Sequence, residues 1–232
     1  VCGLFCSSGV TPLTVICAYL DTLQDNVDEI NPRWSRAQQQ MHQQGSRMQT
    51  LLNDLLLLAK LEATDYPSDN HPVAVQSLLQ TIKNDAQALS GERGQQITLE
   101  ADPTVLLKGS EGELRSAFSN LVFNAVKYTQ DKGNIRIRWW ADEHGAHLSV
   151  QDSGIGIDAK HLPRLTERFY RVDSSRNSNT GGTGLGLAIV KHVLLRHRAR
   201  LEISSVLGHG STFTCHFPPA QVNRSRAVEA DD

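Results

Sequence analysis

Two asparagines and a lysine on one predicted helix have the residue types and the spacing of a metal and phosphate site. Asn120 and Asn124 are four residues apart and Lys127 follows three residues later, so all three point to one side of a helix expected over 111–128. Carboxamide oxygens suit Mg²⁺, which binds a few protein oxygens together with water and phosphate, and a lysine reaches phosphate as a point charge. Taken alone, the same residues fit an ordinary solvated helix face.

An acidic residue at the end of a predicted strand is the second candidate. The strand expected over 147–151 runs into Asp152, and Gly154 and Gly156 follow at alternate positions. The carboxylate could accept a hydrogen bond from an exocyclic amine such as that of adenine, and the two glycines could let the backbone approach the ring closely. The simpler interpretation is a backbone turn without a ligand.

A glycine-rich helix start is the third candidate. Residues 171–184 form a long polar segment, and loops of that length are usually lids or disordered. The helix that follows, expected over 185–197, opens with Gly182, Thr183, Gly184, Leu185 and Gly186. Backbone N–H groups and the helix dipole at such a start favour an anion, in particular phosphate. The pattern does not follow a strand, as the dinucleotide-binding glycine motif requires.

These candidates must be positioned by a domain that mixes strands and helices. After residue 70 the two patterns are interleaved, with too many adjacent strands for a doubly wound parallel sheet, so we expect an α+β sandwich over 70–219. The strands are expected at 95–100, 135–140, 147–151, 201–205 and 212–217, and the helices near 76–90, 111–128 and 185–197. Residues 220–232 lack apolar periodicity and are expected to be a frayed tail.

A helical hairpin precedes this domain. Apolar residues recur at alternating steps of three and four from Leu13 to Ile30, which is a heptad pattern, and Asn31-Pro32 ends that helix. The second helix, expected to end near Ala63, carries two series of residues seven apart: Trp34, Met41, Met48 and Leu55, and Ala37, Gln44, Leu51 and Leu58. Further leucines make the apolar stripe too wide for one partner helix, which favours a four-helix bundle in a homodimer through 11–64. Packing of the hairpin on its own chain is the alternative.

Composition excludes several classes of protein. The chain has 232 residues, of which 39% are hydrophobic, so it can bury a core, and a net charge of -2 gives no general attraction to nucleic acid or an anionic membrane. The longest apolar stretch, 51–63, is interrupted by polar residues and is shorter than the ~20 apolar residues that span a bilayer. Four cysteines without paired metal-ligand spacing are typical of a reducing compartment. We therefore expect a cytoplasmic segment that contacts neither nucleic acid nor membrane.

Four motifs in order resemble the ATP-binding domain of two-component sensor histidine kinases. They are Asn-Leu-Val-Phe-Asn-Ala-Val-Lys-Tyr-Thr at 120–129, Asp-Ser-Gly-Ile-Gly-Ile at 152–157, Glu-Arg-Phe-Tyr-Arg-Val-Asp at 167–173 and Gly-Thr-Gly-Leu-Gly-Leu-Ala-Ile-Val-Lys at 182–191. The resemblance covers 11–219 and is greatest to the phosphate-regulon sensors of this family. It implies a dimerising hairpin that carries a phospho-accepting histidine, followed by the GHKL-type α/β sandwich shared with gyrase-type and chaperone ATPases.

The resemblance also implies roles for individual residues in binding ATP. These are the Mg²⁺ ligands Asn120 and Asn124, the phosphate contacts Lys127 and Arg171, and the adenine contacts Tyr128 and Asp152. The segment 174–183 would close over the nucleotide. Thr11-Pro12, which spacing alone predicts to start a helix, would lie inside the motif His-Glu-x-Arg-Thr-Pro. Its Thr11 would assist dephosphorylation of a partner response regulator.

The sequence departs from the family at the phospho-acceptor. Counting back from Thr11-Pro12 places the histidine of the motif at Ser7 and its glutamate at Ser8. A serine cannot form the phosphoramidate that an imidazole forms, and Ser8 supplies no adjacent base. His42, the first histidine of the chain, lies on the second helix, away from the family position. We therefore expect ATP binding without autophosphorylation, and residues 1–10 are interpreted as an aberrant or truncated head.

Three functions are compatible with these patterns. The first is a sensor histidine kinase, represented here by a segment whose first ten residues differ from the family. The second is a pseudokinase that binds ATP and a response regulator without transferring phosphate. The third is a hydrolysing ATPase of the same fold, but that class places a glutamate four residues before the Mg²⁺-binding asparagine, where this chain has Asn120.

Overall fold

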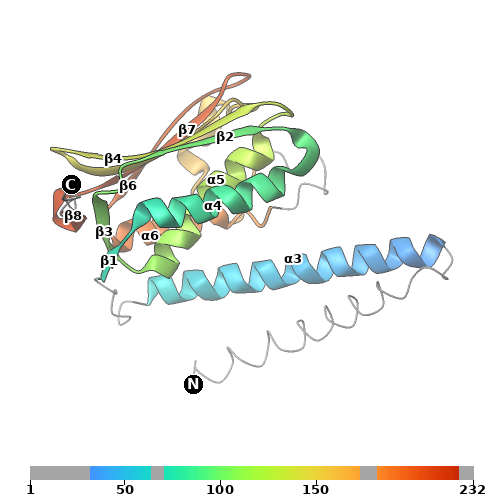
Figure 1. The fold of residues 1–232 in the computed structure, drawn as a ribbon. Helices are drawn as coiled ribbons and strands as arrows, with labels where there is room; N and C mark the ends of the chain where they lie inside the picture. The colour runs from blue at the N-terminus through green and yellow to red at the C-terminus, as the bar shows by residue number, and fades with distance from the viewer. Residues whose placement is uncertain (1–31, 64–70, 173–181, 225–232) are drawn as a thin grey trace, which may run out of the picture.

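The computed structural model describes residues 32–63, 71–172 and 182–224. One long helix is followed by an α/β sandwich, in which three helices cover one face of a five-stranded sheet (Figure 1). This confirms the expected α+β class. The first predicted helix, with Thr11, and the head that contains Ser7 lie outside the described residues, as does 173–181 of the predicted lid.

The five-stranded sheet forms one layer of the sandwich. Its order is β2 (Gln96–Ala101), β4 (Asn134–Asp142), β5 (Gly145–Asp152), β7 (Gly210–Phe217) and β6 (Arg200–Val206). β2 and β4 are parallel, and the other neighbouring pairs are antiparallel. Alternate side chains are buried along β4, where Ile135, Ile137 and Trp139 face the helices. All five strands expected from the sequence are therefore present in one sheet.

The helical layer consists of α4 (Val75–Ser90), α5 (Glu111–Tyr128) and α6 (Gly186–Arg196). Each presents an apolar stripe to the sheet, because its buried residues recur at three- and four-residue steps, as Leu78, Ile82 and Ala86 do on α4. The three predicted helices are confirmed. α5 lies between α4 and α6 and packs on both, so its polar face is held beside the start of α6.

A second, small sheet was not expected from the sequence. It contains β1 (His71–Val73), β3 (Val105–Gly109) and β8 (Val222–Arg224), in the order β1-β3-β8 and antiparallel throughout. β1 and β8 have three residues each, too few to show a period of two, so the sequence did not reveal the two strands that flank β3. The prediction of a frayed tail over 220–232 is wrong for β8, because β3 supplies its hydrogen-bond partners. In the described ranges three short 3₁₀ helices, η2 (Gly91–Arg93), η3 (Ala159–Arg164) and η5 (Pro219–Gln221), connect these elements.

The long helix α3 (Pro32–Glu62) begins at the predicted proline and ends beside α6. Leu58 is 2% exposed and packs into the main core, whereas Met41, Met48 and Leu55 are 49%, 55% and 42% exposed. One predicted heptad series therefore turns toward the chain's own domain at its C-terminal end, as in the alternative stated above. Met41, Met48 and Leu55 of the other series are exposed and offer an apolar face to a further partner. No helix in the described ranges is long and apolar enough to cross a membrane.

Candidate functional site

The polar face of α5 meets the glycine-rich start of α6. Asn120 and Asn124 are partly exposed, and the Asn120 Nδ2 donates a hydrogen bond of 2.9 Å to the carbonyl of Ser116. The Asn120 Oδ1 lies against Gly186, where a Cβ would come within 2.3 Å of it. The fold thus brings two predicted motifs together, and the missing side chain at Gly186 leaves room for the Asn120 oxygen.

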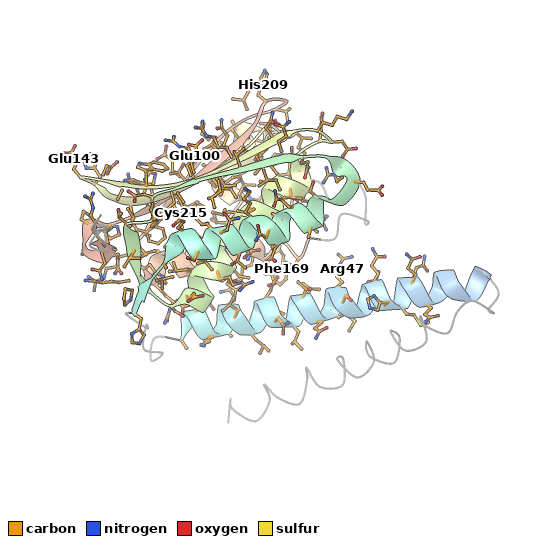
Figure 2. All side chains as sticks on the ribbon, in the orientation of Figure 1. Arg47, Glu100, Glu143, Phe169, His209 and Cys215 are labelled. Carbon is orange, nitrogen blue, oxygen red and sulfur yellow. The ribbon has the colours of Figure 1, made fainter. Side chains whose placement is uncertain are left out.

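Positive charges gather at the C-terminal end of this face. Burial lowers the pKa of the Lys127 ammonium, and the charges of Arg171 and Arg47 lower it further. Its Nζ lies 5.1 Å from the centre of the Tyr128 ring. Arg47 lies on α3 and points toward the helical layer, on the side where Phe169 lies (Figure 2). Mutual repulsion among these cations favours an anion between them, which is what phosphate binding requires.

Asp152 lies at the end of β5 with 7% exposure. Its Oδ1 accepts a hydrogen bond of 2.8 Å from the N–H of Gly154, and burial raises the pKa of its carboxyl. A Cβ at Gly154 would lie 2.4 Å from the Tyr128 carbonyl oxygen, and one at Gly156, whose φ is +65°, would lie 2.0 Å from that of Val206. Both glycines are therefore required by the packing of the chain on itself, a reason that differs from the close approach to a ring expected from the sequence.

The glycine motif is tied to two other segments. Thr183 Oγ1 accepts a hydrogen bond of 3.2 Å from the Leu185 N–H and donates one of 2.9 Å to Oδ2 of Asp54 on α3. Burial raises the pKa of the Asp54 carboxyl, and the bond from Thr183 opposes this shift. The Phe169 N–H donates to the Gly184 carbonyl at 2.9 Å, and both residues have positive φ, +62° and +72°. The motif at 167–173 therefore packs directly on the glycine motif.

The sequence analysis did not anticipate that α3 borders this site. Arg47 and Asp54 are seven residues apart and lie on the same side of α3, and Glu62 near its end forms ion pairs with Arg168 and with His192, the latter at 3.3 Å. The seven-residue spacing of Arg47 and Asp54 was the signal that could have indicated their common orientation. His42 also lies on α3, whereas Ser7, the predicted acceptor position, lies outside the described residues.

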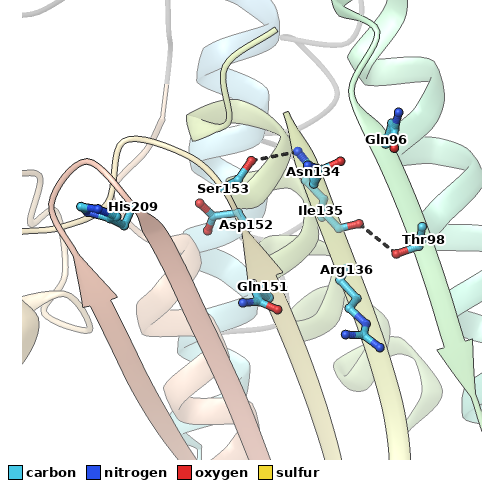
Figure 3. A pocket seen from close by; sticks show the side chains of 9 residues that line it. All are labelled: Gln96, Thr98, Asn134, Ile135, Arg136, Gln151, Asp152, Ser153 and His209. Carbon is cyan, nitrogen blue, oxygen red and sulfur yellow. Dashed lines mark hydrogen bonds between the residues drawn. The ribbon is translucent and has the colours of Figure 1, made fainter. Parts of the chain in front are cut away.

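A separate polar cavity of about 330 Å³ opens on the outer face of the sheet (Figure 3). Its lining consists of Gln96, Thr98, Asn134, Ile135, Arg136, Gln151, Asp152, Ser153 and His209. Only Asp152 belongs to the residues predicted to bind nucleotide. The cavity contains no residue of α5 or of the glycine motif, so it is distinct from the site between α5 and α6.

Comparison with family models agrees with this architecture. Residues 109–221 match the model of the histidine kinase-, DNA gyrase B- and HSP90-like ATPases, and residues 11–64 match the model of the His Kinase A phospho-acceptor domain. The fold and the site thus agree with an ATPase domain of this class, and it follows a segment that matches the phospho-acceptor domain. The chain belongs to the sensor histidine kinase family.

Individual relatives support the same assignment. The phosphate regulon sensor protein PhoR of Pseudomonas aeruginosa is 80% identical over 91% of this chain and 48% of its own length, and that of Haemophilus influenzae is 41% identical over 90% and 48%. The chain spans about half the length of these curated relatives. Among solved structures, full-length ShkA in complex with AMPPNP is similar with a TM-score of 0.77 and 25% identity over 97% of this chain and 46% of that chain.

Proposed function

We propose that this chain is the ATP-binding kinase core of a phosphate-responsive sensor histidine kinase. The observation that carries the proposal is the close packing of the Asn120 side chain on Gly186, at the start of α6. Three cations lie beside this contact: Lys127, with Arg171 and Arg47 close to it. The similarity to two phosphate regulon sensors supports phosphate as the physiological signal. A cytoplasmic location follows from the proposal, because the reaction consumes ATP.

The residues present fit Mg²⁺ and ATP. Asn120 and Asn124 offer neutral oxygen ligands, which Mg²⁺ accepts when phosphate and water complete its coordination. When bound, Mg²⁺ would neutralise charge on the phosphates. Lys127 and Arg171 would hold the phosphate oxygens, and the N–H groups at the start of α6 would add a positive dipole end.

The adenine would be held at the other end of the site. There the Asp152 carboxylate would accept a hydrogen bond from the exocyclic amine, and Tyr128 would contact the ring. Gly182, Gly184 and Leu185 would shape the backbone around the phosphates, with the segment 174–183 closing over them. The chain's part in phosphoryl transfer is thus to bind, orient and neutralise.

The partners that we propose are a second copy of the chain and a response regulator. Dimerisation would use residues 11–64, and in the described part of this segment Met41, Met48 and Leu55 are exposed. In the family arrangement Thr11 would assist dephosphorylation of the regulator. Since Ser7 stands at the acceptor position, this chain would bind ATP without phosphorylating itself.

Calorimetry with ATP in the presence and absence of Mg²⁺ tests the nucleotide site. Asn124→Ala should weaken MgATP binding by more than the ~1 kcal/mol of one neutral hydrogen bond, because the charged phosphates depend on the ion. Asn84→Ala, on the exposed surface of α4, is the matched control and should bind normally. Equal MgATP affinity of Asn124→Ala and the unmodified chain would exclude the assignment.

Incubation with γ-labelled ATP separates the kinase from the pseudokinase. The chain carrying Ser7→His, Ser8→Glu, Gly9→Leu and Val10→Arg should acquire acid-labile, base-stable phosphate and transfer it to a response-regulator aspartate. The unrestored chain should remain unlabelled, with or without His42→Ala. Label that appears on the unrestored chain and disappears in His42→Ala would identify His42 as the acceptor. A restored chain that binds ATP and stays unlabelled would indicate the pseudokinase.

A further inference from the structure

The C-terminal end of α5 is capped by a distant part of the chain. A helix leaves its last carbonyls without intrahelical partners, and these need donors from elsewhere. The Val126 carbonyl accepts hydrogen bonds from Arg93 Nη1 at 2.8 Å and from Gln95 Nε2 at 2.9 Å. The Thr129 carbonyl accepts from Arg93 Nη2 and, at 2.8 Å, from Gln95 Nε2. Two side chains from the η2–β2 connection thus bridge the same two carbonyls.

The helix cannot cap itself in the common way. Thr129, which follows α5, has φ -81° and ψ 137°, so it does not adopt the left-handed conformation that closes roughly a third to a half of helices. The imported guanidinium also complements the negative end of the helix dipole. Arg93 is held in turn, because its Nε donates to Asp131 at 3.0 Å and its carbonyl accepts from the Lys132 N–H at 2.9 Å.

The capped turn is the one that carries two proposed nucleotide contacts, Lys127 and Tyr128. The Tyr128 carbonyl receives a further hydrogen bond of 3.2 Å from the Ile155 N–H, in the turn after Asp152. The turn is therefore held from two sides, by Arg93 and Gln95 and by the Asp152 segment. Upstream, the body of α5 is anchored by apolar residues that are at most 1% exposed: Leu114, Ala117, Phe118, Leu121 and Val122.

We propose that Arg93 and Gln95 are positioning residues of the nucleotide site. They fix the last turn of α5 so that Lys127 and Tyr128 meet the nucleotide, without touching it themselves. Because the helix body is anchored independently, loss of the cap frays this turn and leaves the remainder of α5 in place. The inference rests on the proposed function, since it assumes that nucleotide binds at α5.

Arg93→Ala in the complete chain tests the inference. Measured by calorimetry well below the unfolding temperature, its ATP affinity should fall about tenfold, the size of one lost charge-assisted hydrogen bond. Arg93→Lys should recover part of the affinity, because one ammonium keeps the charge but cannot bridge both carbonyls. Gln95→Glu keeps the shape, replaces the donor by an acceptor and should also weaken binding. Arg115→Ala is the matched control: it lies on α5, pairs with Asp85 at 3.4 Å and should bind ATP normally.

Hydrogen exchange of backbone amides distinguishes positioning from general stabilisation. In Arg93→Ala, faster exchange should be confined to the last turn of α5 and its continuation, residues 125–133, while 113–122 keep their protection. Unchanged ATP affinity in Arg93→Ala, or a loss that Arg115→Ala reproduces, would overturn the inference. Accelerated exchange across the whole domain would do the same, since it would assign Arg93 a purely structural role. Absence of ATP binding by the unmodified chain would instead overturn the proposed function.

Discussion

Gly186→Ala is the sharpest test of the contact between α5 and α6. Alanine is the better helix former, by up to about 1 kcal/mol in a helix interior, so propensity alone predicts a neutral or stabilising change. The structure predicts the opposite, because the new Cβ would lie 2.3 Å from Asn120 Oδ1 and 3.1 Å from its Cγ. Ordinary van der Waals contact begins at 3.4 Å, so Asn120 or the start of α6 must move by about 1 Å.

The Asn120 side chain has little freedom to retreat, since its Nδ2 is bonded to the Ser116 carbonyl at 2.9 Å. Overpacking of this kind costs about 1–3 kcal/mol of folding free energy. The cost to function is of similar size, because a misplacement of about 1 Å in a binding group can reduce activity by as much as about 100-fold, which is about 2.7 kcal/mol. We expect MgATP affinity to fall between about 10-fold and 100-fold, with a smaller effect on ATP without Mg²⁺.

Calorimetry with and without Mg²⁺ measures this difference, and chemical denaturation measures the folding cost. Gly112→Ala is the control, because a Cβ there meets nothing within 4 Å and the residue also lies in a helix. It should keep full MgATP affinity and gain about 0.5–1 kcal/mol of stability. Wild-type MgATP affinity in Gly186→Ala would refute the reasoning that Asn120 acts at this contact.

Three further predictions follow from burial and charge. Burial raises the pKa of Asp152 above 3.8, the ordinary value for an aspartate, so its carboxylate should become protonated at a higher pH than usual. Because protonation removes the charge that accepts the adenine amine, ATP affinity should begin to fall on acidification while the pH is still above 3.8. A titration of ATP affinity against pH checks this, and Asp152→Asn should bind ATP weakly at every pH. Glu113→Ala removes the carboxylate that lies 3.2 Å from the largely buried Arg196 and so breaks this ion pair. The free energy of unfolding, measured in urea, should therefore fall by about 3–5 kcal/mol. A loss below about 1 kcal/mol would contradict this. Met48→Glu and Leu55→Glu should each abolish self-association, as measured by sedimentation. Because both side chains are exposed on α3, the free energy of unfolding should change by no more than about 0.5 kcal/mol. A dimer that persists in both variants would locate the interface elsewhere.

Local patterns in the sequence were sufficient for the main elements and for most of the candidate site. The 3.6-residue period identified α5 and α6, and alternation identified all five strands of the large sheet. Asn120, Asp152 and the glycine motif could be selected because each combines a chemical type with a local spacing. Helix periods, strand alternation and helix starts arise from interactions within a few residues, so one sequence is enough to show them.

Contacts between distant residues were decided only by the tertiary structure. Nothing near Arg93 or Gln95 in the sequence indicates that they cap α5, more than thirty residues away. The approach of Asp54 to Thr183 likewise depends on how α3 packs against α6. The glycines at 154 and 156 were recognised, but their neighbours, Tyr128 and Val206, became evident only in the fold. Such pairs are brought together by the packing of whole elements, and packing depends on the shape and burial of the entire core, which no local pattern contains.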